Sequence, residues 1–101
     1  MAIAEVTVVP IGTADTSLSN YVADCQDVLA QEERVEYQLT PMGTIIEGEL
    51  DDILVAIRKI QEVPFVNGAN RVTTNIKIDD RRDKKASTEQ KIKSVKDKVQ
   101  D

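Results

Sequence analysis

The order in which two hydrophobic periodicities alternate along the chain limits the folds open to it. Strand-like segments are either strictly alternating or rich in β-branched residues, and four of them occur, at 2–10, 35–40, 44–49 and 71–78. Helix-like segments carry apolar residues three or four positions apart, and three occur, at 21–29, 50–60 and 92–99. The predicted order is therefore strand, helix, strand, strand, helix, strand, helix.

Turn and breaker residues predict where these segments end. Pro10 is expected to end pairing of the first strand, and Pro41–Gly43 to form the corner of a hairpin. Asn67–Gly68 is a plausible stop for the second helix. Pro64 should bend or end that helix, because its ring clashes with the carbonyl of residue 60. The last helix should begin near residue 87 or 88.

This order of elements predicts an α+β fold, a ferredoxin-like β-α-β-β-α-β sandwich with an extra C-terminal helix. The length of 101 residues fits one domain, 1–101. Two helices cover one sheet face, so the other face, expected to carry Thr7, Val9, Arg71 and Thr73, should be polar or meet another subunit. The charged tail at 79–101 has only a narrow apolar stripe, and we expect its helix to pack on a neighbouring subunit of a dimer or tetramer.

Composition excludes several classes of function. The chain has no histidine, which removes the usual general base and His-ligated metal sites, and a single cysteine cannot build a Cys metal cage. A formal net charge of -5 and three aromatic residues argue against nucleic-acid binding. No apolar run is long enough for a membrane span, and no signal peptide is evident, so a cytoplasmic protein without catalytic or metal residues is expected.

Three stretches together resemble a known family. They are Val9–Thr13 with Ser17–Val22, then Thr40–Glu49, and then Gly68–Val72 continuing through Lys77–Lys84. Their content, order and spacing are similar to those of the small one-domain thiamine-binding proteins. The resemblance implies a ferredoxin-like fold assembled as a tetramer. It also implies binding of thiamine or its hydroxymethylpyrimidine moiety without chemical conversion, in storage, delivery or sensing, and no resident cofactor.

A thiamine site needs donors and acceptors for the aminopyrimidine edge, an apolar slot for the ring and tolerance of positive charge. The hairpin corner supplies candidates: Thr40 and Thr44 carry hydroxyls, Met42 is a soft neighbour for a flat ring, and Gly43 allows close backbone approach. The same residues also fit an ordinary hairpin corner.

Two further candidates lie outside the corner. Ser19 stands near the start of the first predicted helix, where backbone donors are free, although helix capping would also use such a hydroxyl. Glu47 could accept from the exocyclic amine or offset the thiazolium charge if it faces inward, and is otherwise a solvated or interface carboxylate.

Two other classes of function stay open from the residues alone. A small dimeric α+β barrel enzyme would have to use Tyr21, Tyr37, Arg71 or a carboxylate, since histidine is absent. A ligand-free oligomeric assembly or regulatory module is the other. Cys25 lies on an apolar helix stripe, which favours a core thiol over a nucleophile.

Overall fold

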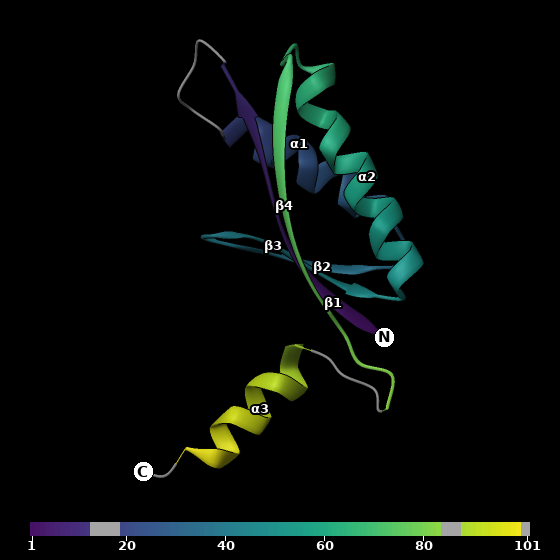
Figure 1. Ribbon diagram of the computed structural model, residues 1–101, viewed down its shortest axis with the longest axis vertical. Helices are drawn as coiled ribbons and strands as arrows, with labels where there is room; N and C mark the ends of the chain where they lie inside the picture. The colour runs from purple at the N-terminus through teal and green to yellow at the C-terminus, as the bar shows by residue number, and fades with distance from the viewer. Residues whose placement is uncertain (13–18, 84–87, 100–101) are drawn as a thin grey trace.

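The structure of the protein, a computed structural model, describes the backbone of residues 1–12, 19–83 and 88–99. Its elements follow the predicted order (Figure 1). They are β1 (Ala2–Ile11), α1 (Ser19–Ala30), β2 (Glu36–Thr40), β3 (Gly43–Gly48), α2 (Leu50–Val66), β4 (Arg71–Asp80) and α3 (Thr88–Lys98). The third strand begins one residue earlier than predicted, and the fourth runs two residues further.

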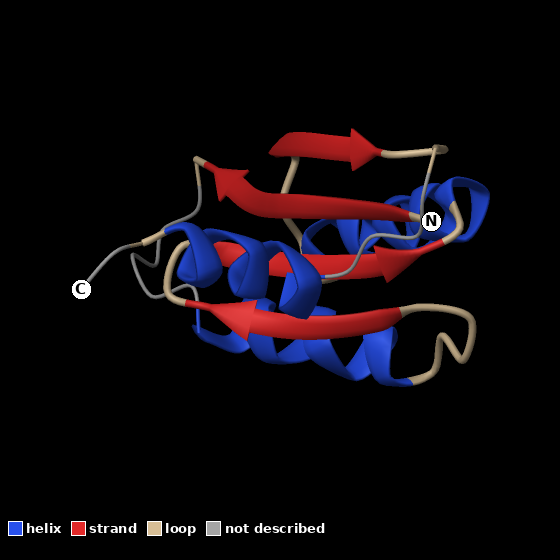
Figure 2. Cartoon of the chain, turned by 90° about the horizontal axis from the view of Figure 1, so that it is seen from below, coloured by secondary structure: helices blue, strands red, loops and turns tan. Residues whose placement is uncertain are grey.

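The four strands form one antiparallel sheet in the order β2-β3-β1-β4 (Figure 2). β1 is central and pairs with β3 on one side and with β4 on the other. The α+β, ferredoxin-like prediction is therefore confirmed, with α3 as the extra C-terminal helix.

The core lies between one face of this sheet and the helices α1 and α2. Even-numbered residues of β1 face it, and two of them are alanines, Ala2 and Ala4, which let the helices lie close to the strand. Ile46 of β3 and the apolar stripes of the helices complete the cluster. The stripe members that are fully enclosed include Leu29 and Ile53.

Pro10 does not end the pairing of β1, which was the prediction from sequence. β1 continues through Pro10, opposite Val72, to Ile11, opposite Arg71. Successive residues of an antiparallel strand direct their main-chain groups to alternate neighbours. The main-chain groups of Pro10, like those of the other even-numbered residues of β1, point toward the β3 side of the strand. Pairing with β3 ends at Val6, so β3 does not reach Pro10. The missing N–H of Pro10 therefore costs no ladder hydrogen bond.

Pro64 lies inside α2, which ends two residues later at Val66, as the sequence indicated. Asn67 caps the helix, and Gly68 follows with a φ of 101°, a left-handed conformation that favours glycine. A proline has no N–H to donate to the carbonyl four residues earlier, here that of Ile60. The Cys25 thiol donates to this oxygen instead, across 3.7 Å.

The second sheet face carries the residues predicted for it. The register aligns Val9 with Thr73 and Ile11 with Arg71, on the face away from α1 and α2, and Thr7 shares that face. The edge strand β2 is less covered than its alternating pattern indicated. Leu39 lies on the helix side, yet 53% of its surface is exposed.

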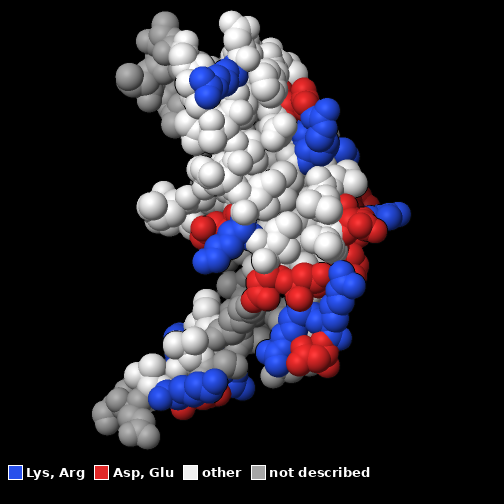
Figure 3. Space-filling view, viewed as in Figure 1, with Lys and Arg blue, Asp and Glu red and all other residues white. Residues whose placement is uncertain are grey.

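The C-terminal helix α3 stands apart from the rest of the chain (Figure 1). Within the described residues it makes no extensive packing with the sheet or with α1 and α2. Charged side chains gather where β4 ends (Figure 3), and there Arg81 pairs with Asp83 and Arg82 with Asp80. Both ion pairs therefore join residues of the same short segment, 80–83. In the part of the chain described, no helix is both long and apolar enough to cross a membrane.

Candidate functional site

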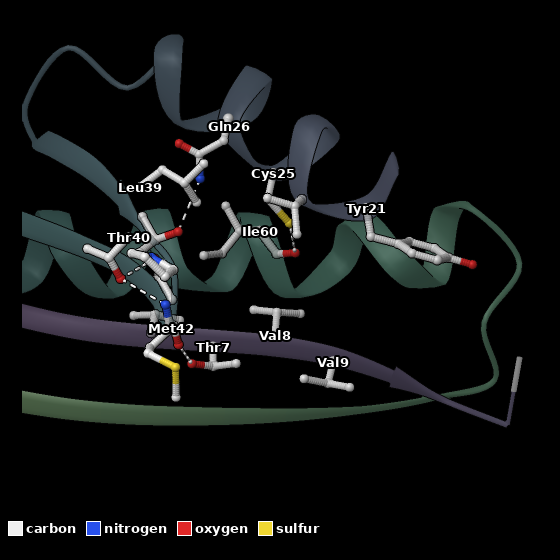
Figure 4. A pocket seen from close by; sticks show the side chains of 15 residues that line it. Thr7, Val8, Val9, Tyr21, Cys25, Gln26, Leu39, Thr40, Met42 and Ile60 are labelled. Atoms are coloured by element: carbon white, nitrogen blue, oxygen red, sulfur yellow. Dashed lines mark hydrogen bonds between the residues drawn. The ribbon is translucent and has the colours of Figure 1, made fainter. Parts of the chain in front are cut away.

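A cavity of about 360 Å³ opens between α1 and the end of the sheet where β3 begins. Figure 4 shows Tyr21, Cys25 and Gln26 projecting from α1 on one side and Thr7, Val8 and Val9 following β1 on the other. Leu39 and Met42 line it at the β2–β3 corner, and the Met42 side chain lies beside Thr7, below β1 in this view. The walls are mainly apolar, and the volume lies in the range usual for small-molecule sites.

Four of the six predicted ligand residues line this cavity: Thr40, Met42, Gly43 and Thr44. Thr40 also holds the corner together, because its hydroxyl donates to the Gly43 carbonyl at 2.9 Å and accepts from the Met42 N–H at 3.3 Å. Met42 is 81% exposed and can change position around a ligand.

Gly43 is needed for packing at the corner. A Cβ at this position would lie 2.9 Å from both the Val6 carbonyl oxygen and the Thr7 hydroxyl. The absence of a side chain thus lets β3 approach β1 closely.

The other two predicted ligand residues are not among the side chains described at the cavity. Glu47 lies on the opposite face of the sheet, half-buried, with Glu36 and Ile3 as its cross-strand neighbours. Ser19 is the first residue of α1, and its side chain lies outside the described residues.

Gln26 is a site residue that sequence reasoning missed. Its Nε2 donates to the Thr44 hydroxyl oxygen at 3.1 Å, which links α1 to β3 across the cavity wall. Among the described residues, the Gln26 amide oxygen and the Thr44 hydroxyl proton have no further partner. The one signal in the sequence was a polar residue directly beside the apolar stripe, next to Cys25.

Cys25 contributes a protonated thiol to the cavity wall. Burial, and secondarily the nearby Asp24 carboxylate, raises the pKa of this thiol to about 11. The thiolate is the nucleophilic form, so the geometry supports the core role predicted from the apolar stripe.

The described lining of the cavity is electrically neutral, since it contains no Asp, Glu, Lys or Arg. Among the described residues, no cluster of His, Cys, Asp and Glu could hold a metal ion. The site therefore offers hydrogen bonds and apolar contact to a ligand.

Comparison with known proteins identifies the family. Residues 4–96 match the profile of the family described as thiamine-binding protein. The chain belongs to the thiamine-binding protein family. Two relatives span nearly the same length, so the family resemblance extends over the whole fold. UPF0045 protein YqgV of Bacillus subtilis is 55% identical over 99% of each chain, and UPF0045 protein MJ1052 of Methanocaldococcus jannaschii is 34% identical over 92% of this chain and 90% of its own.

Solved structures of similar proteins share this thiamine-binding family fold. The crystal structure of MJ1052 superposes with a TM-score of 0.83, covering 94% of this chain and 95% of that one at 34% identity. A Thermotoga maritima protein proposed to act in thiamine biosynthesis or salvage superposes with a TM-score of 0.74, covering 93% of this chain and 97% of that one. Its identity is 19%, so this likeness concerns the fold alone.

Proposed function

We propose that the chain binds thiamine or its hydroxymethylpyrimidine moiety in the cavity beneath α1, without converting it, in thiamine storage, delivery or sensing. The observation that carries this proposal is a neutral cavity of about 360 Å³, in a member of the thiamine-binding family, whose polar groups converge at Gln26 and Thr44. Apolar residues such as Val8 and Leu39 would contact the faces of the pyrimidine ring. The Gln26 amide oxygen would accept from its exocyclic amine.

The neutral lining also indicates which thiamine-related ligands bind best. Phosphate esters prefer Arg, Lys or a group of backbone donors, and the described lining has no cationic side chain. We therefore expect hydroxymethylpyrimidine and thiamine to bind more tightly than thiamine pyrophosphate. The thiazolium cation would lie toward the open mouth of the cavity, where water solvates it.

Isothermal titration calorimetry with these three ligands tests the proposal. Gln26→Leu removes the amide while keeping a similar volume, and we expect binding of hydroxymethylpyrimidine to weaken about tenfold. Glu47→Gln is the matched control, because Glu47 lies on the opposite sheet face and its loss of charge should leave the affinity unchanged. Absence of binding heat with all three ligands on folded protein would overturn the proposal.

We also propose that the chain self-associates as a dimer or tetramer through α3. The apolar stripe of this helix includes Ile92 and Val95, Val99 follows its last residue, and each of the three has at least half of its surface exposed. Such a stripe on a short helix gains stability only by packing against something else. Native mass spectrometry of the purified protein tests this, and a monomer at micromolar concentration would contradict it.

A further inference from the structure

The central strand β1 is longer than the strand that pairs with one of its edges. Its pairing with β4 runs the full length from Ala2 to Ile11, whereas its pairing with β3 stops at Val6, opposite Thr44. Beyond Val6, one edge of β1 therefore continues without β3 beside it. The cavity occupies this place, and Val8 is among its lining residues.

The close approach at Gly43 shows which main-chain groups point to that edge. The Val6 carbonyl oxygen would lie 2.9 Å from a Cβ on Gly43, so Val6 directs its main-chain groups toward β3. In an antiparallel ladder each residue sends its N–H and C=O to the same neighbour, and the direction alternates along the strand. Val8 consequently directs both its N–H and its C=O toward the cavity.

Met42, which a continued register would set opposite Val8, has other partners. Its N–H donates to the Thr40 hydroxyl at 3.3 Å, and its carbonyl accepts from the Thr7 hydroxyl at 3.1 Å. Among the described residues, no backbone hydrogen bond from a turn or loop reaches Val8. One donor and one acceptor of the main chain thus lie side by side in the cavity wall.

We propose that the main-chain N–H and C=O of Val8 bind the edge of a planar heterocycle that carries an exocyclic amine beside a ring nitrogen. One exocyclic N–H donates to the Val8 oxygen, which leaves the other for the Gln26 amide oxygen, and the ring nitrogen accepts from the Val8 N–H. The 4-aminopyrimidine edge has this arrangement, so the inference rests on the proposed function and adds the group that selects for the amine.

A second strand does not fit this edge. Strand addition needs a series of N–H and C=O groups along the edge. The next residue that faces the same way is Pro10, which has no N–H, so a single donor remains. The cavity beside Tyr21 has a volume of about 360 Å³, which fits a small molecule.

Amide exchange by NMR on the ¹⁵N-labelled full chain tests the proposal. In the free protein we expect the Val8 N–H to exchange faster than those of Thr7 and Val9, whose amides face β4. Saturation with hydroxymethylpyrimidine should slow exchange at Val8 at least about tenfold and leave its two neighbours nearly unchanged. The analogue with a methyl group in place of the 4-amino group should bind about tenfold more weakly.

The outcomes separate this inference from the proposed function. Binding heat with unchanged exchange at Val8 would overturn the inference alone. Equal protection of Val8 and Thr7 in the free protein would overturn it as well, because Val8 would then already have a partner. Absence of binding heat would overturn the proposed function and this inference together.

A backbone substitution provides an independent measurement. Cys25 allows a synthetic segment 1–24 to be ligated to residues 25–101, with an ester replacing the amide nitrogen of residue 8. We expect about tenfold weaker binding and only a small loss of stability from the weaker ester carbonyl of Thr7, since the N–H of residue 8 makes no ladder bond. The same change at Val9 removes a bond to β4 and should lower stability. Unchanged affinity of the residue 8 ester would contradict the proposal.

Discussion

At the scale of single residues, the Cys25 thiol and Pro64 act as a pair. Pro64 leaves the Ile60 carbonyl without its helical donor, and the Cys25 thiol supplies one. Cys25→Ala should lower the free energy of unfolding by about 1–3 kcal/mol, because a buried carbonyl loses its donor. In a Pro64→Ala background the new N–H of residue 64 can bond Ile60, so the same change should cost less. Urea unfolding of the four chains measures this coupling, and strictly additive effects would contradict it.

The raised pKa of Cys25 predicts a specific pH dependence of stability. Because the folded-state pKa is about 11 and the ordinary value is 9.0, the unfolded chain loses the thiol proton first as pH rises. The stability that this thiol contributes is complete below pH 9 and is lost as pH rises toward 11. Unfolding midpoints of the wild type and Cys25→Ser from pH 8 to 11 test this. The wild type should lose more stability over this window, and parallel curves would refute the prediction.

The residue scale also shows why the site was only partly predictable from sequence. Thr40 to Thr44 could be found because a hairpin corner collects polar and flexible residues within a few positions. Gln26 could not, since its partner Thr44 is 18 positions away and only the packing of α1 on β3 brings them together. Glu47 could have been placed on the opposite face, because it alternates with the buried Ile46.

At the scale of elements, the order of strands and helices followed from periodicity, whereas strand ends depended on neighbours. The alternation in β4 and the helical stripes are local to each element, and the order of elements that they predicted is confirmed, although Ile76 and Ile78 of β4 are exposed. The continuation of β1 through Pro10 depends on which strand lies beside it, and this is a property of the assembled sheet. The exposure of Leu39 similarly depends on what packs against the edge strand, and the alternation within β2 does not report this.

The corner between β2 and β3 is held in place by the contact of Gly43 with β1. Gly43→Ala should lower the free energy of unfolding by about 1–3 kcal/mol, because its Cβ would meet the Val6 carbonyl and the Thr7 hydroxyl at 2.9 Å. Adding Thr7→Ala removes only the second contact, so recovery should be partial. Chemical unfolding measures both variants. Full recovery in the double variant would show that the Val6 carbonyl imposes no constraint.

At the scale of the whole molecule, we expect the sheet domain to determine folding and α3 to determine assembly. Residues 1–83 contain the sheet, α1, α2 and the described cavity lining, while α3 stands apart with Ile92 and Val95 exposed. A chain ending at residue 83 should therefore keep its fold, measured by circular dichroism, and lose its oligomeric state, measured by light scattering.

The double substitution Ile92→Lys with Val95→Lys should also abolish assembly in the full-length chain while leaving the fold intact, because lysines cannot be buried against a neighbouring subunit without cost. Lys93→Ala, with its side chain exposed, is the matched control and should leave assembly intact. If the truncated chain keeps its oligomeric state, the interface must lie on the second sheet face around Val9 and Thr73, and α3 would have no role in assembly.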